Sequence, residues 1–92
     1  MNTPAILSVL GGDRVGIVAG VSNVLAEAHA NIEDIRQTIL GGIFSMTMLV
    51  TVDEDETPFD EVQRRLAVVA EELGGMQITL QREDVFRYMH RI

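Results

Sequence analysis

Two strand–helix–strand patterns follow one another along this chain, and a pair of glycines joins them. In each half, a short apolar segment precedes an amphipathic segment, and a second strand-like segment follows. Gly41-Gly42 lies between the halves and supplies the positive φ angles that a two-residue β-hairpin turn requires. The order strand–helix–strand–strand–helix–strand is that of the split βαβ, ferredoxin-like plan. This repeated pattern constrains the fold more than any single motif does.

The first half begins with an apolar strand-like segment at residues 4–10, which Gly11-Gly12 ends. Asp13 then stands where a helix N-cap belongs. Residues 14–28 predict an amphipathic helix with an apolar stripe of Val18, Val21, Leu25 and Ala28. Residues 31–40 mix polar and β-branched residues, which is typical of an edge strand with water on one side.

The second half contains the clearest period-two segment, residues 43–52, which predicts a central strand. A charged loop at residues 53–56 follows it. Thr57 is placed to cap the next helix, with Pro58 at its first position. The apolar stripe of that helix consists of Phe59, Val62, Leu66, Val69 and Leu73. Gly74-Gly75 predicts a left-handed C-terminal cap.

The chain then offers a last strand at residues 76–81 and a short amphipathic helix at residues 83–92. We therefore expect an α+β, ferredoxin-like βαββαβ sandwich. It has a four-stranded antiparallel sheet, two helices on one face and a short C-terminal helix. The other face of the sheet carries an apolar set that a second subunit could cover: Ile6, Leu10, Ile43 and Leu49.

Length and composition narrow the function classes. The 92 residues fit a single domain spanning residues 1–92, whose own core gives only a modest stability margin, so a partner subunit would help. The net charge of −7 argues against nucleic-acid or membrane binding, because both require a positive field. No cysteine, signal peptide or membrane-length apolar run occurs, which favours the cytoplasm and excludes disulfides and thiolate chemistry.

The turn at residues 12–18 is the strongest candidate for a small-molecule site. A glycine-containing turn before a helix leaves backbone amides unpaired, and such amides hold carboxylates and phosphates. Asp13 could hold a ligand ammonium group, or it could simply cap the helix, which is typically worth ~1 kcal/mol. Asn31 has an amide that both donates and accepts, which suits a zwitterion as well as a strand start.

The sequence resembles the ACT domain family in three features. These are the turn Gly12-Asp13-x-x-Gly16-Ile17-Val18, the junction Leu25-Ala26-x-x-x-Ala30-Asn31-Ile32 and the βαββαβ order. The ending Asp84-Val85-Phe86-x-x-Met89-His90-Arg91-Ile92 is similar to that of stand-alone bacterial and archaeal single-ACT proteins. Those proteins are also similar to the ACT repeats of glycine-cleavage regulators.

The resemblance implies a small regulatory module that binds an amino acid at an interface between subunits. The implied contacts in the turn are Gly12, Asp13, Arg14, Gly16, Ile17 and Val18. The other implied contacts are Asn31 and Ile32, often reached from the adjacent protomer. Many ACT domains have proline where this chain has Val15, so we expect a less rigid loop here.

Other functions find less support in the residues. An acylphosphatase-like enzyme would need an Asn on the central strand at residues 43–52, and none is present. A P-loop would need Lys-Ser/Thr after the second turn glycine. His29 and His90 lie in different elements, which does not predict a metal site. We expect no enzyme activity, cofactor or metal. The interpretation is an amino-acid-sensing homodimer, with a ligand-free protein–protein adaptor as the alternative.

Overall fold

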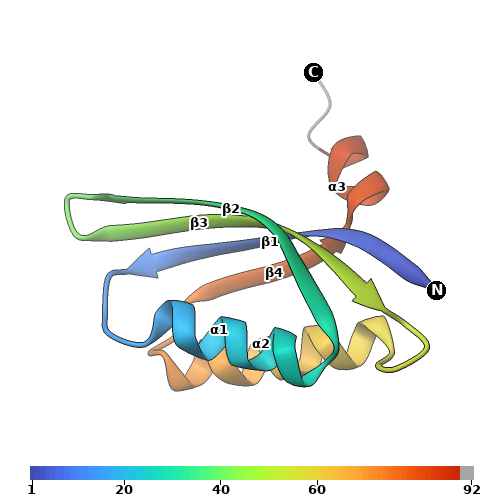
Figure 1. Cartoon of the computed structure of the whole chain (residues 1–92). Coiled ribbons are helices and arrows are strands. Elements are labelled where there is room, and N and C mark those ends of the chain that lie inside the picture. The colour runs from blue at the N-terminus through green and yellow to red at the C-terminus, as the bar shows by residue number, and fades with distance from the viewer. Residues whose placement is uncertain (90–92) are drawn as a thin grey trace.

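The computed structural model describes residues 1–89, and it has the predicted α+β, ferredoxin-like architecture (Figure 1). The tail residues His90, Arg91 and Ile92 lie outside the described residues. The elements in chain order are β1 (Asn2–Gly12), α1 (Ile17–Glu27), β2 (Ala30–Leu40), β3 (Ile43–Asp53), α2 (Phe59–Glu72), β4 (Gln77–Arg82) and α3 (Glu83–Met89). The expected fold class is confirmed.

The four strands form one antiparallel sheet in the order β2-β3-β1-β4. The two most apolar strands, β1 and β3, are central, as their sequences predict. Leu7 lies opposite both Met48 of β3 and Leu80 of β4, so one apolar layer crosses the sheet. Helices α1 and α2 cover the same face of the sheet (Figure 1), and α3 packs on β1 and β4 beyond the end of β4.

The core lies between the sheet and the two long helices. Alternate residues of β1 and β3 point into it: Ala5, Leu7, Val9, Phe44, Met46, Met48, Val50 and Val52. From α1 the buried side chains are Ile17, Val21 and Leu25, whereas Val18 is 38% exposed. The expectation that Val18 belongs to the apolar stripe is therefore wrong. The helix begins three residues later than predicted, and Ile17, one turn before Val21, occupies the first core position instead.

Helix α2 also begins slightly later than its sequence indicates. Pro58, not Thr57, is the N-cap residue, and no side chain caps the helix. Thr57 is instead buried against the core, at 4% exposure. The predicted end is confirmed: Gly74 and Gly75 have positive φ, and the Gly75 amide donates to the Ala70 carbonyl oxygen at 2.9 Å, as in a glycine-terminated helix.

The predicted open sheet face is only partly open. Helix α3 packs over β1 and β4 and shares a surface hollow with Ile6 and Thr47. Leu10 and Ile43 stay exposed near the hairpin turn, at 46% and 54%. Serine, threonine and glutamine side chains alternate with these aliphatic residues on the same face, so the face is mixed rather than continuously apolar.

Candidate functional site

The loop between β1 and α1 crosses from the sheet to the helix layer in four residues. The Asp13 amide donates to the Gly42 carbonyl oxygen at 2.9 Å, which ties the loop to the β2–β3 hairpin turn. Gly16 is the N-cap residue of α1, with φ of 93°, and no side chain caps the helix. The N-cap prediction for Asp13 is therefore wrong, because the chain needs residues 13–15 to reach the helix layer before it can turn.

Glycine is needed at two positions of this loop for different reasons. Gly16 has a left-handed backbone that favours glycine, although a Cβ there would meet nothing within 4 Å. Gly11 is needed for close packing. A Cβ at Gly11 would lie 2.4 Å from the Met76 sulfur, so the glycine lets Met76 pack against β1.

Several backbone amides of the loop are unpaired. Among residues 1–89, the amides of Arg14, Val15 and Gly16 donate to no backbone or side-chain acceptor. The first backbone bond of α1 runs from the Gly20 amide to the Gly16 carbonyl oxygen, so the amides at the helix start lack partners within the helix. The unpaired amides that the sequence predicts at this turn are present. Ile17 contributes only its backbone, because its side chain is buried in the core.

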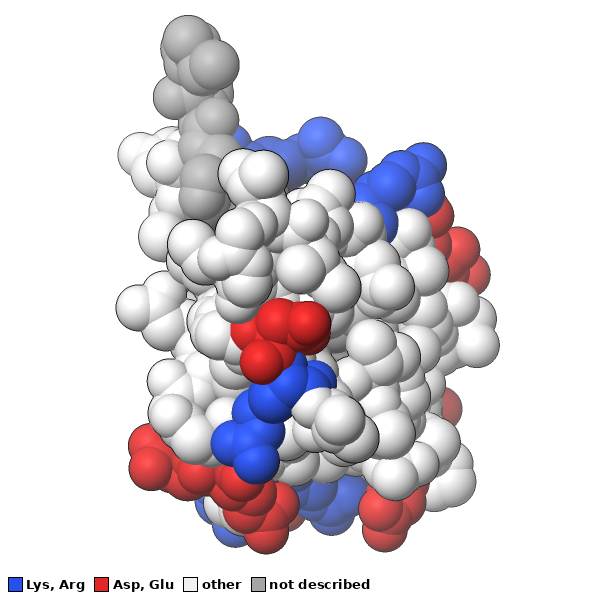
Figure 2. All heavy atoms as spheres, turned by 90° about the vertical axis from the view of Figure 1, so that its left-hand side faces the viewer, with Lys and Arg blue, Asp and Glu red and all other residues white. Residues whose placement is uncertain are grey.

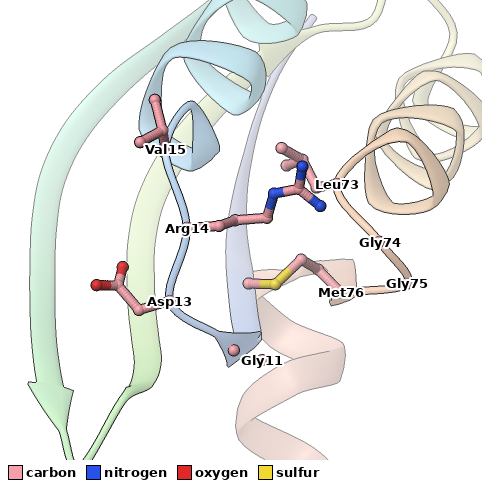
Figure 3. Close-up of a pocket in the computed structure, with 9 residues that line it drawn as sticks. Gly11, Asp13, Arg14, Val15, Leu73, Gly74, Gly75 and Met76 are labelled. Carbon is pink, nitrogen blue, oxygen red and sulfur yellow. The ribbon is translucent and has the colours of Figure 1, made fainter.

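The side chains of Asp13 and Arg14 point to opposite sides of the loop. Figure 3 shows the Asp13 carboxylate directed away from the cavity and toward the β2–β3 hairpin, while Arg14 extends into the cavity between this loop and the α2–β4 loop. The cavity measures about 420 Å³, and the α2–β4 loop lines it with Leu73, Gly74, Gly75 and Met76. The sequence did not predict these four residues as part of the site; the Gly74-Gly75 pair was the available signal.

Asn31 and Ile32 lie at the other end of α1 from the turn. Helix α1 has 11 residues, which places its ends ~16 Å apart. The Asn31 side-chain amide donates to Glu33 at 2.9 Å, and the Thr51 hydroxyl donates to the same carboxylate at 3.0 Å. Both hydrogen bonds lower the pKa of the Glu33 carboxyl, and the bond from Asn31 has the larger effect. One chain alone therefore does not bring the two predicted halves of the site together.

Strand β2 is long, and along its free edge it carries exposed isoleucines on one face. Ile32, Ile35 and Ile39 lie opposite Val50, Met48 and Phe44, so all three are on the helix-covered side of the sheet. A register shift between Ile32 and Asp34 puts Ile35 on that side. The three isoleucines are nevertheless 37%, 38% and 59% exposed, because the long helices leave this edge uncovered.

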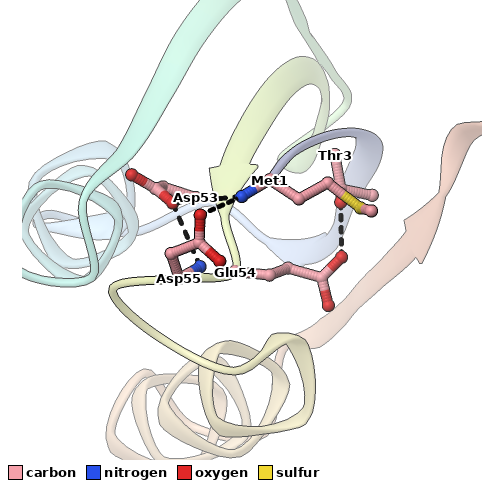
Figure 4. Close-up of polar contacts among 5 residues, drawn as sticks. All are labelled: Met1, Thr3, Asp53, Glu54 and Asp55. Carbon is pink, nitrogen blue, oxygen red and sulfur yellow. Dashed lines mark hydrogen bonds and ion pairs between the residues drawn. The ribbon is translucent and has the colours of Figure 1, made fainter.

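The acidic loop at residues 53–56 makes contacts within the chain. Figure 4 shows the Met1 amino group paired with Asp53 and Asp55, and the Thr3 hydroxyl bonded to Glu54. Arg82 donates to Glu54 at 3.0 Å and lies over the Phe59 ring. Within residues 1–89, no three His, Cys, Asp or Glu side chains gather in a way that could hold a metal ion.

Comparison with known proteins identifies the family of this chain. The sequence profile of the ACT domain matches residues 3–81. The chain is a member of the ACT domain family. A UPF0237 protein of Methanocaldococcus jannaschii is 51% identical to it over 87 residues, which are 95% of this chain and 96% of the relative.

Two solved structures extend the likeness. An ACT domain protein from Streptococcus pneumoniae is 34% identical, with a TM-score of 0.75, and the match covers 91% of this chain and 93% of that one. A putative glycine cleavage system transcriptional repressor has a TM-score of 0.78 at 22% identity, over 89% of this chain and 46% of that one, and shows the shared fold. The resemblance to the ACT family and to its single-domain members is thus confirmed, and the likeness to a glycine-cleavage regulator is one of fold. No helix within residues 1–89 of this ACT protein is long and apolar enough to cross a membrane.

Proposed function

We propose that this ACT protein is a regulatory homodimer that binds a free amino acid between its subunits. The observation that carries the proposal is the separation of the two predicted half-sites. The turn at residues 12–18 lies at one end of α1, and Asn31 and Ile32 lie at the other end. A second copy, related by a two-fold axis, would bring the turn of one subunit to the Asn31 region of the other. Membership of the ACT family supports a regulatory role.

Strand β2 offers the surface for this pairing. Among residues 1–89 its outer edge has no partner strand, and antiparallel pairing of two β2 strands would continue the sheet across the dimer. In the register that sets Ile35 opposite Ile39 of the partner subunit, these two exposed isoleucines cover one another. Gln37 then lies on the two-fold axis. Such cross-strand aliphatic pairs stabilise antiparallel sheets.

The same register predicts where Asn31 of the partner subunit lies. Counting back from Ile35, and omitting the extra residue at the register shift, Asn31 of the partner subunit comes opposite Gly42. The Gly42 carbonyl oxygen accepts the bond from the Asp13 amide. The half-site that one chain lacks would therefore stand beside the Asp13 side of the turn.

The chemistry of the combined site suits an amino-acid zwitterion. The unpaired amides of residues 14–16 would hold the ligand carboxylate. The Asp13 carboxylate and the side chain of Asn31 of the partner subunit would hold the ammonium group. The partly exposed Val18 and Ile32 of the partner subunit would contact the ligand side chain. Because the ligand contacts both subunits, it favours the arrangement that best closes the site, and this difference in affinity is the signal. A free amino acid as ligand implies action in the cytoplasm.

A calorimetric titration with each amino acid tests the ligand. We expect saturable heat from at least one amino acid at millimolar concentration. Asp13→Ala and Asn31→Ala should each weaken that binding about tenfold, by removing a charge-assisted hydrogen bond to the ligand. Glu71→Ala, an exposed change on α2, is the control. Absence of heat from every amino acid would contradict amino-acid sensing.

Engineered cysteines test the pairing of β2, because the natural sequence has none. A residue on the two-fold axis faces its own copy, with Cα atoms ~4.5–5.5 Å apart in an antiparallel pair, which suits a disulfide. Gln37→Cys should form a covalent dimer under mild oxidation. Thr79→Cys, also at an exposed position but on β4, should remain a monomer on a non-reducing gel. Equal cross-linking of the two variants would overturn the β2 pairing.

A ligand-free adaptor remains the alternative function, and the same β2 edge supports it. An 11-residue unpaired edge can accept a strand from another protein as readily as from a second copy. Sedimentation at micromolar concentration separates the two proposals. A dimer supports the sensor; a monomer that also gives no heat with amino acids supports the adaptor.

A further inference from the structure

Arg14 differs from the other arginines that the structure describes. Arg36, Arg64, Arg65, Arg82 and Arg87 each form an ion pair with an acidic side chain. Arg14 has no acidic partner and no hydrogen bond among residues 1–89. The Arg14 side chain is exposed, and no acidic side chain of the described residues neutralises its charge.

The lack of a side chain at Gly74 leaves space for the Arg14 guanidinium. A Cβ at residue 74 would lie 2.8 Å from its Nη1 atom, so Gly74 leaves the space into which the guanidinium extends. Leu73 and the largely buried Met76 line the same cavity, beside the stem of Arg14. Met76 is in turn held by its close contact with Gly11. Residues from two loops far apart in the sequence thus form one cavity around an unpaired cation.

The geometry points to an anion site within a single subunit. We propose that the cavity between the β1–α1 and α2–β4 loops binds a small oxyanion, a carboxylate or a phosphate, on Arg14. A guanidinium matches the oxygen geometry of either group with two parallel hydrogen bonds. A cavity of about 420 Å³ accommodates a metabolite-sized ligand. Figure 2 shows this end of the molecule, where a basic group stands out on a largely uncharged surface, with acidic groups above and below it.

This site is distinct from the inter-subunit site proposed above. Asp13 and Arg14 are directed to opposite sides of the loop (Figure 3). A ligand in the cavity would therefore contact Arg14, Leu73 and Met76 without reaching the Asp13 carboxylate. Both walls of the cavity, the β1–α1 loop and the α2–β4 loop, are already formed within one chain.

A nuclear magnetic resonance titration tests the proposal with two probes, sodium phosphate and sodium glutarate, at constant ionic strength set with sodium chloride. At least one probe should shift the amide signals of residues 11–15 and 73–76 saturably. Arg14→Gln should raise the midpoint of that titration at least about tenfold, because it removes the guanidinium that would donate two charge-assisted hydrogen bonds to the anion. Arg64→Gln removes an equal charge from α2 and should change the midpoint less than about twofold. The amide spectrum of each variant shows whether it is folded.

The two probes separate the sources of the oxyanion. Saturation by phosphate alone assigns the site to phosphorylated ligands, and saturation by glutarate alone assigns it to organic acids. The titration is repeated in Ile35→Lys, which should weaken the proposed pairing of β2. An unchanged midpoint there supports the site even if the dimer proposal fails. Shifts that never saturate with either probe, or that are equal in wild type and Arg14→Gln, overturn the anion site.

Discussion

The two edges of the sheet are built differently. Strand β4 has six residues, its Leu80 side chain is buried, and the Gln63 side chain of α2 donates to the Leu80 carbonyl oxygen at 2.7 Å. Strand β2 has 11 residues and exposes three isoleucines along its outer side. Short, covered edges resist pairing with other chains, and long apolar edges invite it. The chain thus protects one edge with its own side chains and leaves the other available to a partner.

The largest expected effect compares one apolar residue from each edge. Leu80→Ala should lower the free energy of unfolding by about 2–4 kcal/mol, because it leaves a cavity in the core. Ile39→Ala, at a 59% exposed position, should cost less than about 1 kcal/mol in dilute solution.

Urea denaturation at several protein concentrations measures both effects. The cost of Ile39→Ala should grow with concentration, since it acts through association, whereas that of Leu80→Ala should not. A cost of Ile39→Ala that is independent of concentration would contradict the contrast between the edges.

A charge placed on each edge tests association directly. Ile35→Lys should raise the dissociation constant of the dimer about 100-fold, because two ammonium groups would be held near the pairing surface without acidic partners. Thr79→Lys adds the same charge to β4 and should leave the constant within about twofold. Analytical ultracentrifugation gives both constants. Equal weakening by the two changes would show that β2 is not the special edge.

The hydrogen bond that covers β4 can be removed alone. Gln63→Leu keeps the volume of the side chain but leaves the Leu80 carbonyl oxygen without its donor, so the free energy of unfolding should fall by about 1 kcal/mol. Glu72→Gln, near the end of the same helix, is the control and should have an effect near zero. Thermal unfolding measures the difference. If Gln63→Leu is as stable as the wild type, the Gln63 bond does not hold this edge.

The smallest expected effect is the acid response of the helix that supports β4. Arg64 and Arg65 donate to Glu61 and lower the pKa of this carboxyl from 4.5 to about 2. Because the pKa in the folded protein is the lower one, this stabilisation is present above about pH 4.5 and is lost as the pH falls toward 2. Glu61→Gln should therefore reduce the loss of stability between these pH values.

Urea denaturation at pH 5, 4 and 3 compares Glu61→Gln with Asp60→Asn. Asp60 is on the same helical turn and forms no ion pair within residues 1–89. An identical pH slope for wild type and Glu61→Gln would show that the ion pairs do not stabilise the folded state.

Local patterns were sufficient to predict the strand order and the end of α2, which two glycines mark. Period two in residues 43–52 and the Gly41-Gly42 turn each depend on neighbours in the sequence, and the structure confirms both. The helix starts were less accurate. Asp13 and Thr57 have the right residue types for capping, but the length of chain needed to reach the helix layer sets where each helix begins.

The β2 edge shows a different limit. Ile32 and Ile35 are three residues apart, so strict alternation would place them on opposite faces of the sheet. The register shift between Ile32 and Asp34 brings both to the same face. Such a shift arises from pairing with β3, and no pattern within residues 31–40 marks it.

The candidate site was predicted in part. The turn at residues 12–18 and its unpaired amides are where the sequence analysis expected them. The cavity on the Arg14 side was missed, because its other wall comes from residues 73–76, about 60 positions along the chain. The Gly74-Gly75 pair was interpreted only as a helix end, although Gly74 also makes room for the guanidinium.

The sequence by itself determined the order of elements, the identity of the central strands and the position of the β1–α1 turn, since all of these follow from the spacing of apolar and glycine residues along neighbouring positions. The tertiary structure decided which side of the turn each side chain faces, which of the arginines within residues 1–89 lacks an acidic partner, and which sheet edge stays open. Those features depend on contacts between segments distant in the chain, and only the packed sheet and helices bring such segments together.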